Sequence, residues 1–123
     1  MREIKFRAWD EGLEEMIYFD LLSTDRLDFQ LMTEYLEGSF VMQYTGLKDK
    51  NGKEIYERDI LEITEKSVYV YPGIYQVVYG AGGFDIEMKS FGESITHRLG
   101  EIPNGYNEVI GNIHENPELL KIK

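Results

Sequence analysis

The chain has 123 residues, of which 42% are hydrophobic and 13% aromatic, a composition typical of one globular domain. It contains no cysteine, which excludes disulfides, thiolate nucleophiles and cysteine-built metal sites. Its formal net charge of −10 argues against ordinary binding to a nucleic-acid phosphate backbone, because such binding needs clustered lysine and arginine. With no apolar run long enough for a membrane span and no signal-peptide pattern at the N-terminus, we expect a cytoplasmic protein that contacts no membrane.

The negative charge is concentrated in residues 8–47, where nine acidic side chains stand against the single basic residue Arg26. A solvated face that keeps the protein soluble explains such a segment. The alternative is an acidic surface that docks on a basic partner or imitates nucleic acid.

The N-terminal part of the chain is predicted to form a β-hairpin. Residues 3–9 alternate strictly between apolar and polar side chains, which indicates a half-buried strand with Lys5 and Arg7 on its polar face. Residues 10–12 indicate a turn, and residues 15–22 indicate the second strand.

The pattern changes over residues 23–37. Leu27, Leu31 and Tyr35 recur at helical spacing, which predicts a short amphipathic helix, although an irregular crossover also fits.

The remainder of the chain consists of short β-prone runs between glycine-containing turns. Strands are predicted over residues 40–45, 59–63, 68–71, 75–79, 84–88 and 106–113. Asn51-Gly52 favours a type I′ turn, which needs two positive φ angles. Asn116-Pro117 predicts the start of a short helix, whereas residues 90–105 are weakly patterned. This succession predicts a mainly β fold, a small barrel or sandwich of short antiparallel strands with one or two short helices.

We expect a single domain over residues 1–123. Within it, residues 1–45 would form the hairpin, the crossover and one strand, and residues 46–123 the barrel core and the short C-terminal helix.

The two histidines, His97 and His114, lack the spacing of a metal site, so they could share a metal only if the fold brought them together. Surface or partly buried imidazoles are the simpler interpretation. Ser94 stands three residues before His97, but a serine–histidine pair without an orienting acid is weak evidence for nucleophilic catalysis. Acid pairs such as Glu14 and Glu15 are expected by chance in so acidic a chain.

Two loops look like ligand-binding motifs but fit turns better. Residues 49–52 begin like a calcium loop, yet Glu54 and Ile60 occupy the positions that require glycine and a bidentate acid. Residues 80–83 are glycine-rich like a phosphate-binding loop, but a strand-like segment follows them where such a loop needs a helix.

Nine tyrosines are the most suggestive feature of the composition. Four of them, Tyr69, Tyr71, Tyr75 and Tyr79, cluster near one predicted turn and hairpin. We expect most tyrosines in the core and at its rim, whereas an exposed stripe of them would indicate a binding or oligomer surface.

Three stretches of the chain, residues 4–10, 43–60 and 108–120, together resemble the YopX family of small proteins encoded by phages and prophages. The middle stretch carries the long and specific motif QYTGLKDKNGKEIYE, followed after one residue by Asp59-Ile60. The resemblance implies an SH3-like β-barrel, a mobile-element origin and a bacterial host cytoplasm. It supplies no biochemical activity.

The chain departs from the family pattern at Arg58, where the family usually has a glycine before Asp59-Ile60. This departure implies either a relaxed turn or a modest strain cost. The matching residues Gly46, Asn51, Gly52 and Asp59 are interpreted as determinants of turns and barrel corners, not as a catalytic set.

These features predict a non-enzymatic module that binds a host or phage protein, with no catalytic residues, no cofactor and no metal. One alternative is an acidic decoy that imitates nucleic acid and occupies a DNA- or RNA-binding protein. Another is a small hydrolase-type enzyme that uses carboxylates or His97 and His114. A homo-oligomer is also expected, because β-sheet edges are commonly protected by pairing with a second copy.

Overall fold

The computed structural model describes residues 4–20, 40–67, 70–80, 82–90, 92–103 and 105–120. The helix or crossover predicted over residues 23–37, as well as Tyr69, lies outside these residues. The described chain is mainly β, as predicted. Its strands are β1 (Lys5–Asp10), β2 (Glu15–Asp20), β3 (Phe40–Lys48), β4 (Glu54–Tyr56), β5 (Asp59–Ile63), β6 (Gly73–Gly80), β7 (Gly83–Ser90), β8 (Glu93–Arg98) and β9 (Asn107–Asn112).

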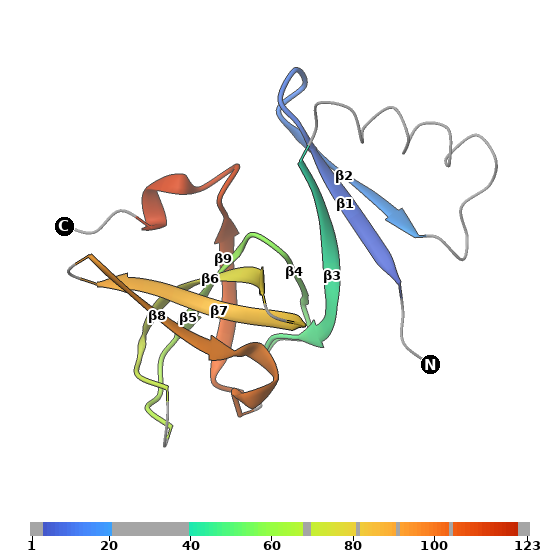
Figure 1. Ribbon diagram of the computed structural model, residues 1–123. Coiled ribbons are helices and arrows are strands. Elements are labelled where there is room, and N and C mark those ends of the chain that lie inside the picture. Colours follow the sequence, from blue (N-terminus) through green and yellow to red (C-terminus); the bar gives the residue numbers. More distant parts are fainter. Residues whose placement is uncertain are drawn as a thin grey trace.

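The strands form two antiparallel sheets (Figure 1). One has the strand order β2-β1-β3-β4, and the other, which curls into a half-barrel, has the order β8-β7-β6-β5-β9. Figure 1 shows the first sheet standing beside the half-barrel, with β3 running between the two. The N-terminal hairpin and the barrel-like second sheet therefore agree with the predicted fold class.

The β1–β2 hairpin has the predicted pairing but not the predicted exposure. Its turn is closed by the Asp10 carboxylate, which accepts hydrogen bonds from the Gly12 and Leu13 amides at 2.9 and 3.1 Å. The prediction of an exposed polar face was wrong at Arg7, whose side chain is buried together with its neighbours Ala8 and Trp9. Both faces of β1 are covered here, because one of them packs against the corner between β4 and β5.

β3 bends at Thr45 and Gly46 as it passes from one sheet partner to the other. Phe40–Gln43 pair with β1, whereas Tyr44 and Lys48 pair with β4 across a register shift. The Thr45 hydroxyl donates to the Ile55 carbonyl at 2.7 Å, and Gly46 takes a φ of +86°. A side-chain hydrogen bond and one left-handed residue thus replace ladder pairing at the bend.

The turn between β3 and β4 is not the type I′ turn that Asn51-Gly52 predicted. Of the two residues only Gly52 has a positive φ, at +81°. The Gly52 amide donates to the Asp49 carbonyl at 3.0 Å, and the Asp49 amide donates to the Lys53 carbonyl at 2.8 Å. This is a type I turn followed by a left-handed glycine, which the Asp49 side chain stabilises by accepting from the Asn51 and Lys53 amides.

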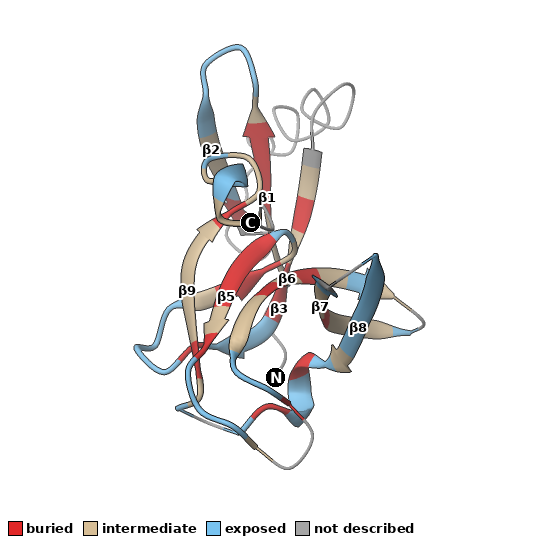
Figure 2. Cartoon of the chain, turned by 90° about the vertical axis from the view of Figure 1, so that its left-hand side faces the viewer, coloured by how far each residue is buried: buried red, intermediate tan, exposed pale blue. Residues whose placement is uncertain are grey.

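The half-barrel encloses the main hydrophobic core (Figure 2). Its buried members are Ile55, Leu61, Ile63, Val70, Tyr75, Val77, Ile86, Leu99 and Ile102. Gly80 lies opposite Gly83 and Gly82 takes a φ of +87°, which agrees with the tight turn predicted for this glycine-rich stretch, of which Ala81 lies outside the described residues.

Two short 3-10 helices complete the described chain, η1 (Leu99–Glu101) and η2 (Pro117–Leu120). The second confirms the short helix predicted after Asn116. No helix within the described residues has the length and apolar character required to cross a bilayer.

Two features of the half-barrel differ from what the sequence pattern predicts. In the stretch predicted as a strand over residues 68–71, the described residues Val70 and Tyr71 lie outside any strand. The weakly patterned residues 90–105 contain β8, an edge strand whose single aliphatic residue, Ile95, gives no alternation to detect.

Arg58 occupies the position where a glycine was expected, and it carries backbone strain. Its φ is +70°, a left-handed conformation that few L-residues adopt without cost. Its amide donates to the Val77 carbonyl at 2.8 Å, and its carbonyl accepts from the Ile113 amide at 3.0 Å. These bonds join the corner to β6 and to the end of β9, so the chain cannot relax the strain without losing them.

Arg58→Gly should therefore stabilise the protein by about 1 kcal/mol, since glycine adopts a positive φ without steric cost. The free energy of unfolding from urea denaturation measures the effect. Gly52→Ala is the opposite control, because it places a Cβ at a φ of +81° and should destabilise by a similar amount. A loss of stability in Arg58→Gly would show that the arginine side chain contributes more than its backbone costs.

Candidate functional site

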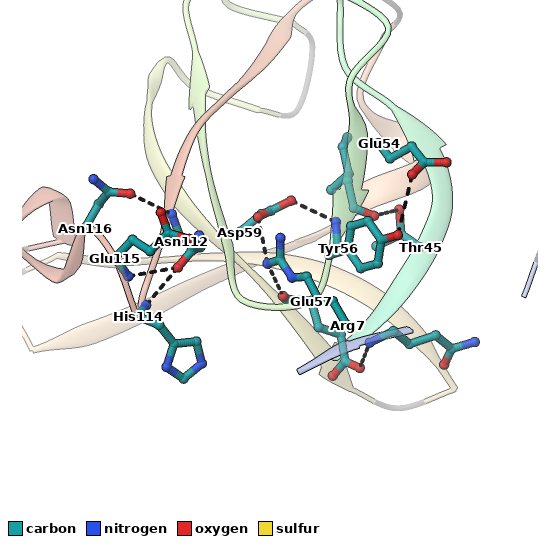
Figure 3. Close-up of polar contacts among 12 residues, drawn as sticks. Arg7, Thr45, Glu54, Tyr56, Glu57, Asp59, Asn112, His114, Glu115 and Asn116 are labelled. Carbon is teal, nitrogen blue, oxygen red and sulfur yellow. Dashed lines mark hydrogen bonds and ion pairs between the residues drawn. The ribbon is translucent and has the colours of Figure 1, made fainter. Parts of the chain in front are cut away.

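A buried ion pair joins the two sheets. Arg7 on β1 donates from Nη2 to Asp59 Oδ1 on β5 at 2.8 Å and to the Glu57 carbonyl at 3.0 Å. The second Asp59 oxygen accepts from the Tyr56 amide at 2.8 Å. The two charged side chains are only 4% and 3% exposed, and the Arg7 guanidinium lies 4.7 Å from the centre of the Tyr56 ring (Figure 3).

Burial has the largest effect on the pKa values of the titratable groups around the Arg7–Asp59 pair. Desolvation raises the pKa of Asp59, and the Arg7 charge and the Tyr56 amide only partly oppose it. Burial, together with the nearby Glu54 carboxylate, raises the pKa of Tyr56 to about 12, so its hydroxyl stays protonated at neutral pH. Lys5 and Glu54 add a second link between β1 and β4 at 2.7 Å, in a more exposed position.

The Asp49 carboxylate attaches the β3–β4 turn to β9. Oδ2 accepts from the Val109 amide at 2.9 Å, while Oδ1 serves the two amides of its own turn. The Lys50 amide also donates to the Asn107 carbonyl at 3.0 Å. Because both Asp49 oxygens face N–H donors, they are oriented for the backbone and not for a cation, which agrees with the interpretation of this loop as a turn.

The chain turns sharply after β9. Asn112 Oδ1 accepts from the His114 and Glu115 amides at 3.0 and 2.9 Å, and Asn116 Oδ1 lies 3.3 Å from the Asn112 amide (Figure 3). Gly111 is required here, because a Cβ at this position would lie 2.5 Å from Asn116 Oδ1. The turn places the His114 ring on Trp9 of β1, stacked with ring centroids 5.6 Å apart.

These elements surround a groove of about 300 Å³, which we call the junction groove. The Arg7–Asp59 pair lies in its lining, and Tyr18 on β2, which is 60% exposed, stands at its rim. Its other lining residues are Lys53, Val109, Ile110, Gly111, Asn112, Glu115 and Asn116. Apart from Tyr18, all of them belong to the three stretches that resemble the YopX family.

Comparison with known proteins identifies the family. A model of the YopX protein family matches residues 5–121, nearly the whole chain. The chain belongs to the YopX family. No curated protein matches it.

Two solved structures show the same fold. Protein EF1440 from Enterococcus faecalis has a TM-score of 0.59 and 28% identity, over 96% of this chain and 98% of that one. YopX from Bacillus subtilis has a TM-score of 0.58 and 23% identity, over 97% of each chain. This YopX-family fold is common to proteins whose names carry no activity, so function has to be argued from surfaces and sites.

The structure does not bring His97 and His114 together. His97 lies on β8, where its ring meets Tyr75 edge-on at 6.4 Å, whereas His114 follows β9, at the other edge of the same sheet, and stacks on Trp9. Ser94 and His97 are an odd number of positions apart on β8, so they point to opposite faces of the sheet. No group of three or more metal-ligating side chains occurs within the described parts of the chain.

The tyrosines divide between the core and the surface. Tyr75 is fully buried and donates to the Tyr71 carbonyl at 2.7 Å. Tyr71 and Tyr79, both 61% exposed, point to solvent and do not lie in the junction groove. The turn role of Asp59 was predicted from the sequence, whereas its pairing with Arg7 and the exposure of Tyr18 were not. The position of Arg7 within the first YopX-like stretch was the available signal.

Breaking the ion pair should be costly. Asp59→Asn or Arg7→Met leaves one buried charge without its counter-ion, and we expect each to lower the free energy of unfolding by about 3–5 kcal/mol. The double variant Arg7→Met/Asp59→Asn removes both charges and should lose less stability than either single variant, because it leaves no buried charge without a counter-ion. Chemical denaturation of the four proteins measures the coupling. Single variants within about 0.5 kcal/mol of the parent would mean that the pair does not hold the sheets together.

His114 makes the stability of the fold depend on pH. Its burial, with Arg7 and Arg58 nearby, lowers the pKa of His114 below its ordinary value of 6.5. The unfolded chain therefore takes up this proton first, and stability falls as pH drops below 6.5 until the folded pKa is passed. His114→Phe keeps a ring on Trp9 and should reduce the slope of unfolding free energy between pH 7.5 and 5.5. An unchanged slope would assign the dependence to other groups.

Proposed function

We propose that this YopX-family protein is a non-catalytic module that binds another protein through the junction groove. The observation that carries the proposal is the groove itself: a cavity of about 300 Å³ with Tyr18 exposed at its rim. Exposed aromatic side chains beside a concave site are typical of protein-binding surfaces. The volume of the junction groove suits one or two side chains of a partner protein.

The polar groups of the groove favour binding over catalysis. Asp59 uses one oxygen for Arg7 and the other for the Tyr56 amide, so neither is directed at a substrate. The Tyr56 phenol beside it stays protonated at neutral pH. A general base or nucleophile needs a group within reach of the substrate with a pKa near the working pH.

The charges around the groove favour a protein over a nucleic acid. Lys53 and Glu115 contribute opposite charges to its lining, and Arg7 is already neutralised by Asp59. A phosphate backbone needs several unpaired cations in a row. The partner would be a protein of the bacterial host or of the mobile element that encodes the chain.

An acidic decoy is the second candidate, supported by one feature of the described structure. The turn of the β1–β2 hairpin exposes Glu11 and Glu14, and the exposed Glu15 follows. If this acidic tip occupies a basic protein, binding should weaken steeply as salt is raised, whereas contacts in the junction groove should be less sensitive to salt.

Tyr18→Ala tests the groove. The variant protein, immobilised on a resin and exposed to nuclease-treated bacterial lysate, should retain the captured partner about tenfold more weakly than the parent, as expected for an aromatic anchor. Quantitative mass spectrometry across a salt series provides the measurement. Tyr79→Ala is the matched control, because Tyr79 is equally exposed at 61% but lies outside the groove lining.

The result that overturns the proposal is equal capture by Tyr18→Ala and Tyr79→Ala, with both shown to be folded. Binding that disappears only when Glu11 and Glu14 are neutralised would favour the decoy. Binding that is lost in Tyr79→Ala but kept in Tyr18→Ala would place the contact surface on the half-barrel instead.

A further inference from the structure

β8 is the terminal strand of the half-barrel sheet. Within the described chain it pairs only with β7, and five of its six residues are exposed (Figure 2). The opposite edge, β9, is covered by the β3–β4 turn through the bonds from Asp49 and Lys50. An uncovered edge presents unpaired backbone N–H and C=O groups that can template another strand.

The register with β7 fixes which face each β8 side chain occupies. Ile95 is opposite Met88, which packs on the core, so Glu93, Ile95 and His97 share the inner face. Ser94, Thr96 and Arg98 therefore lie on the outer face.

A second copy can extend the sheet by antiparallel pairing about a two-fold axis perpendicular to it. This symmetry places the inner faces of the two sheets on the same side. Each β8 residue therefore lies opposite a residue of the second copy whose number is the same as its own or differs from it by an even number. With the axis at Ile95, the side chains of β8 complement themselves. Glu93 faces His97 of the second copy, Ser94 faces Thr96, and Ile95 faces itself.

The neighbouring registers match less well. An axis at Ser94 places Glu93 opposite Ile95, and an axis at Thr96 places Ile95 opposite His97. Hydrogen-bonding, hydroxyl–hydroxyl and apolar cross-strand pairs each stabilise an antiparallel ladder, whereas a polar side chain opposite an aliphatic one does not. The register with Ile95 on the axis is the one in which every pair from 93 to 97 is chemically matched.

We propose that two copies of this chain pair through β8, with Ile95 on the two-fold axis, into one continuous ten-stranded sheet. The occupant of the edge is thus a second copy of the chain. Because each copy carries a net charge of −10, moderate salt should strengthen the pairing by screening the repulsion between them.

The absence of native cysteine makes the register directly testable. Under mild oxidation Ile95→Cys should form a disulfide-linked dimer, since directly opposed residues in an antiparallel pair lie within disulfide range. We expect this to be roughly tenfold or more faster than for Tyr79→Cys, an exposed position away from β8 that reports random collision. Non-reducing electrophoresis measures both rates.

The mixed experiment distinguishes this register from any other. Ser94→Cys and Thr96→Cys should each cross-link slowly alone, but a mixture of the two should form a heterodimer rapidly. Cross-linking of Ile95→Cys no faster than Tyr79→Cys, or rapid cross-linking of Ser94→Cys alone, overturns the proposal.

Charge substitutions test the same contact without cysteine. Sedimentation analysis should show a concentration-dependent dimer for the parent chain, and monomers for Ile95→Lys and Ile95→Glu alone. A mixture of these two variants should dimerise again, because lysine then faces glutamate across the axis. A parent chain that stays monomeric over the whole concentration series, or an Ile95→Lys variant that still dimerises, contradicts the proposed pairing through β8.

Discussion

The Arg7–Asp59 ion pair is the constraint on which the arrangement of the two sheets depends. Both charges are removed from water, so each depends on its counter-ion and on further hydrogen bonds, although Arg7 Nε is buried without a hydrogen-bond partner among the described residues. Asp59 therefore also binds the Tyr56 amide, and Arg7 the Glu57 carbonyl. These bonds fix the corner between β4 and β5 against β1. The strained φ of Arg58 lies within this corner, so the surrounding contacts determine the backbone there, not its own preference.

The stretches that resemble the YopX family supply most of the bonds between side chains and backbone that hold the loops. Asp49 attaches the β3–β4 turn to β9, Asn112 and Asn116 shape the turn after β9, and Asp59 holds the central corner. The residues in the stretches that resemble the family therefore serve mainly to stabilise the fold. The surfaces that this architecture leaves available, Tyr18 at the groove and the edge of β8, are where we place function.

Sequence patterns predict where the strands of this fold lie better than they predict which side chains are buried. Alternation located β1, β5 and β7, because each has apolar side chains facing a core. The same alternation wrongly predicted that Arg7 is exposed to solvent, because a pattern that repeats every two residues cannot reveal that a second sheet covers the polar face of β1. It could not locate β8, whose residues are nearly all exposed. The junction groove could not be derived either, because it forms only when segments far apart in the sequence are brought together by the ion pair, whose two residues are 52 positions apart.

The two proposed contact surfaces are compatible because they lie at opposite edges of the half-barrel sheet. The groove is bordered by β9, whereas β8 is the far strand in the order β8-β7-β6-β5-β9. Pairing through β8 therefore leaves both grooves of a dimer open and relates them by the two-fold axis. A partner that carries two binding segments, or is itself dimeric, would gain avidity from such an arrangement without any new contact. An edge contact that is weak alone could then be strengthened by the partner, since occupation of both grooves by one molecule holds the two copies together.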